Sequence, residues 1–144
     1  MLKMLAFLQI NLYNIHMKHK FTPQQHREYI ILSRKTGMDW LEVFSGNTDF
    51  YSTYFWELLT EMWFHDKPVM VSDALRYMKS IKSPFTARKY LQKAIDGKLV
   101  VERKNPSDER SILVELPPEM RKKLDAFFDK SIEKLLDSAE NLKK

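Results

Sequence analysis

The sequence predicts a mainly α fold that carries one small β-hairpin. Apolar residues recur at helical spacing over most of the chain. Cap residues followed by proline, at 22–23 and 83–84, mark the starts of two helices. The pattern changes only after Gly97, where the β-branched runs 99–103 and 111–116 predict two strands. Helices therefore build the chain, and a single hairpin interrupts them near its end.

The first part of the chain is predicted to be helical. The apolar run Met1–Met17 is interrupted by polar residues and is shorter than the ~20 residues that cross a bilayer. We therefore expect a helix buried against protein, and no membrane anchor or signal peptide. A second helix is expected from Pro23 to about Lys35, ending near Gly37, with a further turn of helix over 39–43.

Three more helical segments are expected in the middle of the chain. A strongly aromatic helix is predicted from Phe50 to about His65, with Asp49 as its cap. A short helix capped by Ser72 follows a proline, and a turn over 80–82 separates it from a helix over 84–97. Two short helices joined by so tight a turn are typical of a helix-turn-helix.

The hairpin after these helices is predicted to be a wing. Strands 99–103 and 111–116 enclose the segment 104–110, whose Asn-Pro-Ser-Asp run is a turn sequence. Two prolines at 117–118 stop the second strand and open a last helix. A hairpin directly after a helix-turn-helix defines a winged helix.

Charge is distributed unevenly along the chain. The segment 76–104 holds nine basic residues against Asp96 and Glu102, a net charge of +7, while the rest of the chain sums to −2. The segment 36–66 contains no Lys or Arg and carries six acidic residues. Such a concentration suits a surface that binds a polyanion, although a solvated basic face is the simpler alternative.

Composition excludes several other classes. The chain has no cysteine, so it lacks disulfides and thiolate metal sites, as expected for a cytoplasmic protein. Its three glycines are too widely spaced for a phosphate-cradling loop. His16 and His19 have the spacing of two metal ligands, but no third ligand is evident. We therefore expect no metal, no cofactor and no enzymatic activity.

The helix over 84–97 separates into two faces. At about 100° per residue, Ala87, Leu91, Ala94 and Ile95 fall within one arc, which suits a core. Cationic and amide side chains on the opposite arc can bond base edges or phosphates in a major groove, and an aromatic ring can touch thymine methyl groups. The first free N–H groups can also hold a phosphate. The candidate DNA contacts of this helix are Ser83, Phe85, Thr86, Arg88, Lys89, Gln92 and Lys93.

At the hairpin the sequence resembles the MarR family of bacterial regulators. The segment Leu99–Leu116 has that family's strand ending in arginine, its Asp-x-Arg wing, here Asp108 and Arg110, and its apolar second strand. The resemblance covers roughly residues 50–136. It implies that Arg110 supports the wing and approaches the minor groove, where arginine is favoured. The wing candidates for DNA contact are Arg103, Lys104 and Arg110.

The family resemblance also implies a homodimer with intertwined terminal helices. We accordingly divide the single domain 1–144 into an N-terminal dimerisation region 1–48, a winged-helix region 49–116 and a C-terminal dimerisation helix 117–144. Packing within one monomer is the alternative explanation of the apolar stripe on the last helix. The residues of that stripe are Leu124, Phe128, Ile132, Leu135, Ala139 and Leu142.

Together these features predict a sequence-specific regulator of transcription that binds double-stranded DNA as a homodimer. The helix 84–97 would lie in the major groove and the wing 103–110 at the minor groove. A winged helix that binds protein, and a phage or plasmid replication initiator, are the alternatives. Tyr51 and Tyr54 are candidates for the pocket of a small-molecule effector, against the simpler interpretation that the aromatic helix is ordinary core.

Overall fold

The computed structural model describes residues 1–6 and 19–144, with residues 2–6 helical. The helix expected over Met1–Met17 therefore lies largely outside the described residues. From Pro23 onward the elements are α2 (Pro23–Val43), the 3-10 helix η1 (Thr48–Phe50), α3 (Thr53–His65), β1 (Val69–Met70), α4 (Val71–Tyr77), α5 (Pro84–Asp96), β2 (Val101–Lys104), β3 (Ile112–Glu115) and α6 (Pro118–Leu142).

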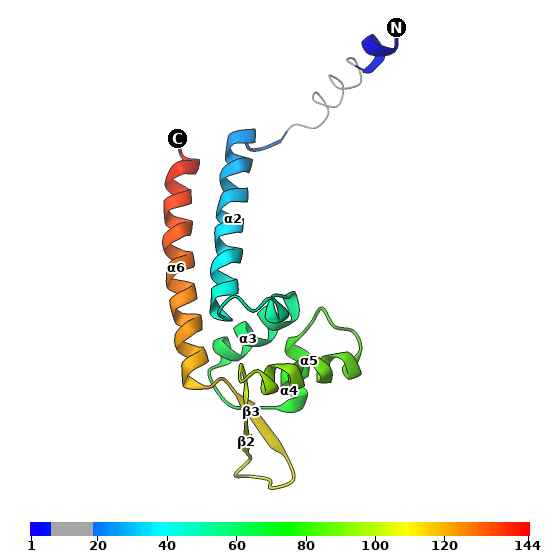
Figure 1. Cartoon of the computed structure of the whole chain (residues 1–144), viewed down its shortest axis with the longest axis vertical. Helices are drawn as coiled ribbons and strands as arrows, with labels where there is room; N and C mark the ends of the chain where they lie inside the picture. Colours follow the sequence, from blue (N-terminus) through cyan, green and yellow to red (C-terminus); the bar gives the residue numbers. More distant parts are fainter. Residues whose placement is uncertain (7–18) are drawn as a thin grey trace.

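The described elements form two parts (Figure 1). The long helices α2 and α6 lie side by side and run in opposite directions. At one end of this pair, α3, α4 and α5 form a lobe from which the β2–β3 hairpin projects. The order α4, turn, α5, hairpin is that of a winged helix, which confirms the predicted fold class.

A two-residue strand completes the sheet of the wing. The strand order is β1-β3-β2, and both pairs are antiparallel. Val69 of β1 lies opposite Val114 of β3, and both side chains are buried. The predicted strand 99–103 begins only at Val101, because the buried Leu99 and Val100 connect α5 to the sheet without pairing.

The core lies beneath α5. Phe55, Leu58 and Leu59 of α3 are fully buried. So are Val100, directly before β2, and Val114 in β3. The core face predicted for α5 is confirmed, and its buried residues are Ala87, Leu91 and Ala94. Contacts from α3 and α4 thus fix the orientation of α5.

The predicted end of the second helix near Gly37 is wrong, because α2 continues to Val43. A Cβ atom at residue 37 would lie 2.7 Å from the Tyr51 hydroxyl oxygen, so the glycine provides room for Tyr51 against an unbroken helix. The expected start is confirmed, since Thr22 and Gln25 form a reciprocal capping box.

Two predicted caps are also wrong. Asp49 lies within η1, which Asn47 caps by accepting a hydrogen bond of 3.0 Å from the Asp49 N–H, so the aromatic helix begins at Thr53. Ser72 lies within α4, which begins at Val71 directly after β1. The local Asn47 cap displaces the first start, and the pairing of β1 with β3 precedes the second.

Polar contacts join α2 to α6. Ser138 and Asn141 donate hydrogen bonds of 2.9 and 3.2 Å to the Glu28 carboxylate, and the Asn141 and Ser138 bonds hold the pKa of Glu28 below its usual value. Nearer the lobe, the buried Asp39 carboxylate pairs with the Lys134 ammonium. These bonds fix the register of the two helices.

The link from α5 to the sheet is a tight turn of unusual composition. Gly97 has φ −81°, whereas Lys98 has φ +58°, the left-handed conformation that normally favours glycine. A Cβ atom at residue 97 would lie 2.5 Å from Cζ of Phe50. The close contact with Phe50 therefore requires glycine at residue 97, while Lys98 adopts the left-handed backbone conformation that is unfavourable for a residue with a Cβ atom.

We expect Lys98→Gly to stabilise the fold by about 1 kcal/mol, because a residue with a Cβ atom is strained in the left-handed region. The measurement is chemical denaturation of both proteins. An unchanged or lower free energy of unfolding would contradict the assigned strain.

Gly97→Ala is the matched control, one residue earlier in the same turn. It is expected to lower the free energy of unfolding by about 1 to 3 kcal/mol, because the added methyl group displaces the Phe50 ring. Changes of opposite sign in the free energy of unfolding would separate the effect of backbone conformation at Lys98 from the effect of steric room at Gly97.

Candidate nucleic-acid interface

The sequence fixes the start of α5 locally. Ser83 is the N-cap and accepts a hydrogen bond of 3.4 Å from the Thr86 N–H, and Pro84 occupies the first turn. The exposed Ser83 and Pro84 leave this helix end open to solvent. The positive end of the helix dipole is thus accessible to an anion.

The outward face of α5 is basic and exposed. Phe85 is 80% exposed. Arg88 and Lys89, one turn later, are exposed and have no salt-bridge partner within residues 19–144. Gln92 is exposed and donates a hydrogen bond of 2.9 Å to Asp96, while Thr86 is half-buried. The structure thus brings four of the predicted helix contacts onto one solvent face.

Lys93 differs from its neighbours. Its ammonium group donates a hydrogen bond of 3.3 Å to the Asp49 carbonyl and lies 5.9 Å from the centre of the Phe50 ring. The side chain therefore attaches η1 to α5. Sequence reasoning placed Lys93 on the outward face, and the helical wheel gave no sign of this partner.

The turn before α5 is held by α3. The Glu57 carboxylate accepts a hydrogen bond of 3.0 Å from the Ser80 N–H and another from the Ser80 hydroxyl. One turn further along α3, Glu61 lies 3.7 Å from the Lys79 ammonium. Glu57 was not identified from the sequence, because nothing local links it to a turn 23 residues away.

A shallow groove runs between α5 and the sheet. Phe85, Arg88 and Lys89 line one side, and Val71 and Glu102 belong to its other walls. Glu102 was not predicted as a site residue. Its carboxylate adds an acceptor to a face that otherwise presents donors.

The tip of the wing is shaped by two side chains, each of which accepts a hydrogen bond from the backbone N–H two residues further on. The Asn105 side chain accepts from the Ser107 N–H and donates to the Ser111 hydroxyl, at 3.0 and 2.8 Å. Asp108 accepts a 3.0 Å hydrogen bond from the Arg110 N–H. The Asp-x-Arg pair thus acts through the backbone, and the exposed Arg110 guanidinium projects from a fixed turn.

The other wing candidates differ in their partners. Arg103 lies 3.4 Å from the Glu115 carboxylate on the neighbouring strand. Lys104 is exposed at the end of β2. Arg110 and Lys104 are therefore the freer cations of the wing, while Arg103 is partly neutralised.

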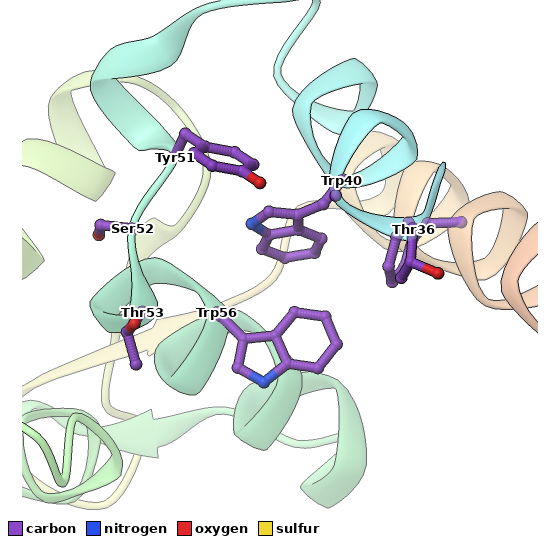
Figure 2. A pocket seen from close by; sticks show the side chains of 8 residues that line it. Thr36, Trp40, Tyr51, Ser52, Thr53 and Trp56 are labelled. Carbon is purple, nitrogen blue, oxygen red and sulfur yellow. The ribbon is translucent and has the colours of Figure 1, made fainter. Parts of the chain in front are cut away.

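A cavity of about 400 Å³ lies between α2, α6 and the start of α3. Figure 2 shows Tyr51, Trp40 and Trp56 around it. Trp40 and Ser52 contribute to its lining, but the Trp40 Nε1 and Ser52 Oγ atoms themselves are buried and have no hydrogen-bond partner among the described residues. The Tyr51 hydroxyl group is the polar group that faces the aromatic walls, and it can bind an acceptor.

Of the two tyrosines predicted for a pocket, one lines this cavity. Tyr51 does so, and its hydroxyl group lies against Gly37. Tyr54 does not line it, because its ring packs against Tyr90 of α5 with 4.6 Å between ring centres. Trp40 and Ser52 were missed, since only the folded chain reveals that their polar atoms are unpaired.

No other chemical site emerges from the part of the chain that the structure describes. Residues 1–6 and 19–144 contain no cluster of three or more potential metal ligands. His16 lies outside these residues, and the His19 ring packs edge-on against His26. In the same residues, no helix combines the length and apolar character needed to cross a membrane.

Comparison with known proteins gives structural likenesses only. No protein-family model and no curated protein matches the chain. The structure titled overoxidized AbfR bound to DNA is 18% identical, covers 94% of this chain and 90% of its own, and has a TM-score of 0.48. Reduced AbfR bound to DNA is 16% identical, covers 99% of this chain and 97% of its own, and has a TM-score of 0.45. A MarR transcription factor from Planctomyces limnophilus is 17% identical, covers 87% of this chain and 91% of its own, and has a TM-score of 0.43. With all three TM-scores below 0.5, the winged-helix assignment rests on the topology of this chain itself.

Proposed function

We propose that this chain is a MarR-type regulator of transcription that binds double-stranded DNA, with α5 in the major groove and the wing at the minor groove. One observation carries the proposal. The outward face of α5, the second helix of a helix-turn-helix, holds the exposed cations Arg88 and Lys89, which have no salt-bridge partner among residues 19–144. A cytoplasmic location accords with this role.

The geometry of the interface supports both contacts. An α-helix fits the major groove, where Arg88, Lys89 and Gln92 have the groups that bond bases and phosphates. At the start of α5, Pro84 has no N–H and those of Thr86 and Ala87 are bonded to Ser83, so the Phe85 N–H and the Ser83 hydroxyl group are the donors for a phosphate. Arg110, held by its wing turn, suits a narrow minor groove of strong negative potential.

Titration of duplex DNA at several salt concentrations tests this proposal. We expect affinity to fall steeply with salt, and Lys89→Glu to weaken binding about tenfold or more and to reduce the salt slope by about one, as loss of a phosphate contact does. Lys144→Glu, an equal charge change after the end of α6, is the control and is expected to bind nearly as the parent protein. No DNA binding at low salt would refute the proposal and favour the protein-binding alternative.

We also propose a homodimer formed through α2 and α6. Polar bonds hold these helices together, while large apolar side chains on both of them face solvent. Exposed apolar area of this extent is typical of an interface. Two copies related by a twofold axis would address two half-sites about one DNA turn, roughly 34 Å, apart. The exposed apolar residues are Tyr29, Ile30, Ile31, Met38, Ile132, Leu135 and Leu136.

Sedimentation of two lysine variants of α6 tests the dimer. Leu135→Lys places a charge on the apolar side of the helix and is expected to weaken dimerisation by about tenfold or more. Glu133→Lys, on an exposed acidic flank of the same helix, is expected to remain dimeric. A parent protein that is monomeric at micromolar concentration would contradict the proposed assembly.

The cavity beside Tyr51 is proposed as an effector site. Aromatic walls and the hydroxyl group of Tyr51 suit a planar ligand that bears a hydrogen-bond acceptor, such as an aromatic carboxylate. Tyr51 is the predicted effector residue that remains in this proposal, together with Trp40 and Ser52.

Calorimetric titration with benzoate, a planar carboxylate, tests the cavity. Tyr51→Phe removes the hydroxyl group that faces the cavity and is expected to weaken binding about fivefold to tenfold. Tyr54→Phe, outside the cavity, is the matched control with no expected effect. Absence of benzoate binding, or equal binding by Tyr51→Phe, would contradict the assigned donor.

A further inference from the structure

The first turn of α5 exposes an aromatic ring that no contact within the monomer explains. Among the large apolar side chains of residues 19–144, Phe85 is the most exposed, at 80%. It makes no aromatic pair with any described residue. Leaving a phenylalanine in water forgoes the stabilisation that burial provides. A partner surface that covers the ring would recover it.

The neighbours of this ring indicate what such a partner presents. Arg88 and Lys89 lie three and four residues further along α5, and therefore on the same helix face as Phe85. All three side chains line the groove toward the wing. The partner must thus combine negative charge with an isolated apolar group. An apolar protein surface would require two cations to lose their water without an acceptor.

The major groove of DNA has this combination. Phosphates supply the negative charge, and the base edges present hydrogen-bonding groups with one apolar exception, the 5-methyl group of thymine. A phenyl ring has no donor or acceptor and so cannot distinguish the polar edges. It can distinguish a base that carries a methyl group from one that does not.

Resting on the proposed function, we propose that Phe85 is a specificity-determining residue that recognises the 5-methyl group of a thymine in each half-site. The Phe85 N–H and the Ser83 hydroxyl group at the start of α5 hold the adjacent phosphate, which fixes the helix end against the groove. Phe85, two residues after the cap, then contacts the base edge. Thr86 also has an apolar group in this turn, its methyl group, but it is half-buried.

Replacement of thymine by uracil isolates this contact, because it removes the methyl group and keeps every hydrogen-bonding group. A preferred duplex is first selected from a random pool with the full-length protein. Each thymine of that duplex is then replaced in turn, and affinity is measured for the parent protein, Phe85→Ala and Phe85→Leu. Thermal unfolding of the three proteins is expected to coincide, since the ring is exposed.

We expect one uracil-sensitive position in each half-site. Loss of one methyl contact is expected to weaken binding about threefold to fourfold, and replacement in both half-sites about tenfold. Phe85→Ala should bind the thymine duplex weakly and show no further loss on uracil, so that the two changes are not additive. Phe85→Leu, which keeps an apolar side chain, should retain part of the sensitivity.

The outcomes separate this inference from the proposed function. Failure to select or bind any duplex at low salt overturns the DNA-binding proposal itself. Binding that no uracil replacement weakens overturns methyl recognition alone. A uracil-sensitive position that stays equally sensitive in Phe85→Ala assigns the methyl contact to another residue and overturns the role of Phe85.

Discussion

The contact between Phe50 and Gly97 links the two parts of the molecule. The Phe50 ring packs against Phe44 at the end of α2 and Phe55 in α3, with 5.7 and 5.2 Å between ring centres. Only a residue without Cβ lets the same ring reach the end of α5. Lys93 adds a hydrogen bond to this segment from within α5. The position of α5 therefore depends on one aromatic ring that also contacts the end of α2.

This arrangement gives a physical route from the cavity to α5. Tyr51 and Ser52, which line the cavity, follow Phe50 directly in the chain. A ligand that accepts a hydrogen bond from Tyr51 would restrain a segment whose neighbouring residue, Phe50, packs on Gly97. An effector changes DNA affinity only if it binds one conformation of the protein more tightly than another, and if α5 is placed differently in the two conformations. Only Phe50 separates the cavity residue Tyr51 from the contact with Gly97, so a ligand-induced shift of Tyr51 would act directly on the end of α5.

What the sequence predicted well was encoded locally. Ser83, Pro84 and Gly97 mark the ends of α5 with side chains that act within a few residues, and the wing depends on Asn105 and Asp108 bonding their own backbone. The features that were missed depend on distant partners. Gly37 suggested a helix end, yet Tyr51 packs over it in a continuous helix. The hydrogen bonds of Glu57 and Lys93, and the buried unpaired polar atoms beside the cavity, likewise appear only when remote segments meet.

The two proposed surfaces of the molecule depend on each other. A single α5 offers a few base contacts, and recognition of one methyl group discriminates by a small factor. Two copies joined through α2 and α6 would multiply that factor, because one rigid assembly engages both half-sites at once. Rigidity matters here, since effective concentration is lost when the spacing between sites varies. The buried Asp39–Lys134 pair and the bonds to Glu28 supply it by fixing the register of α2 against α6.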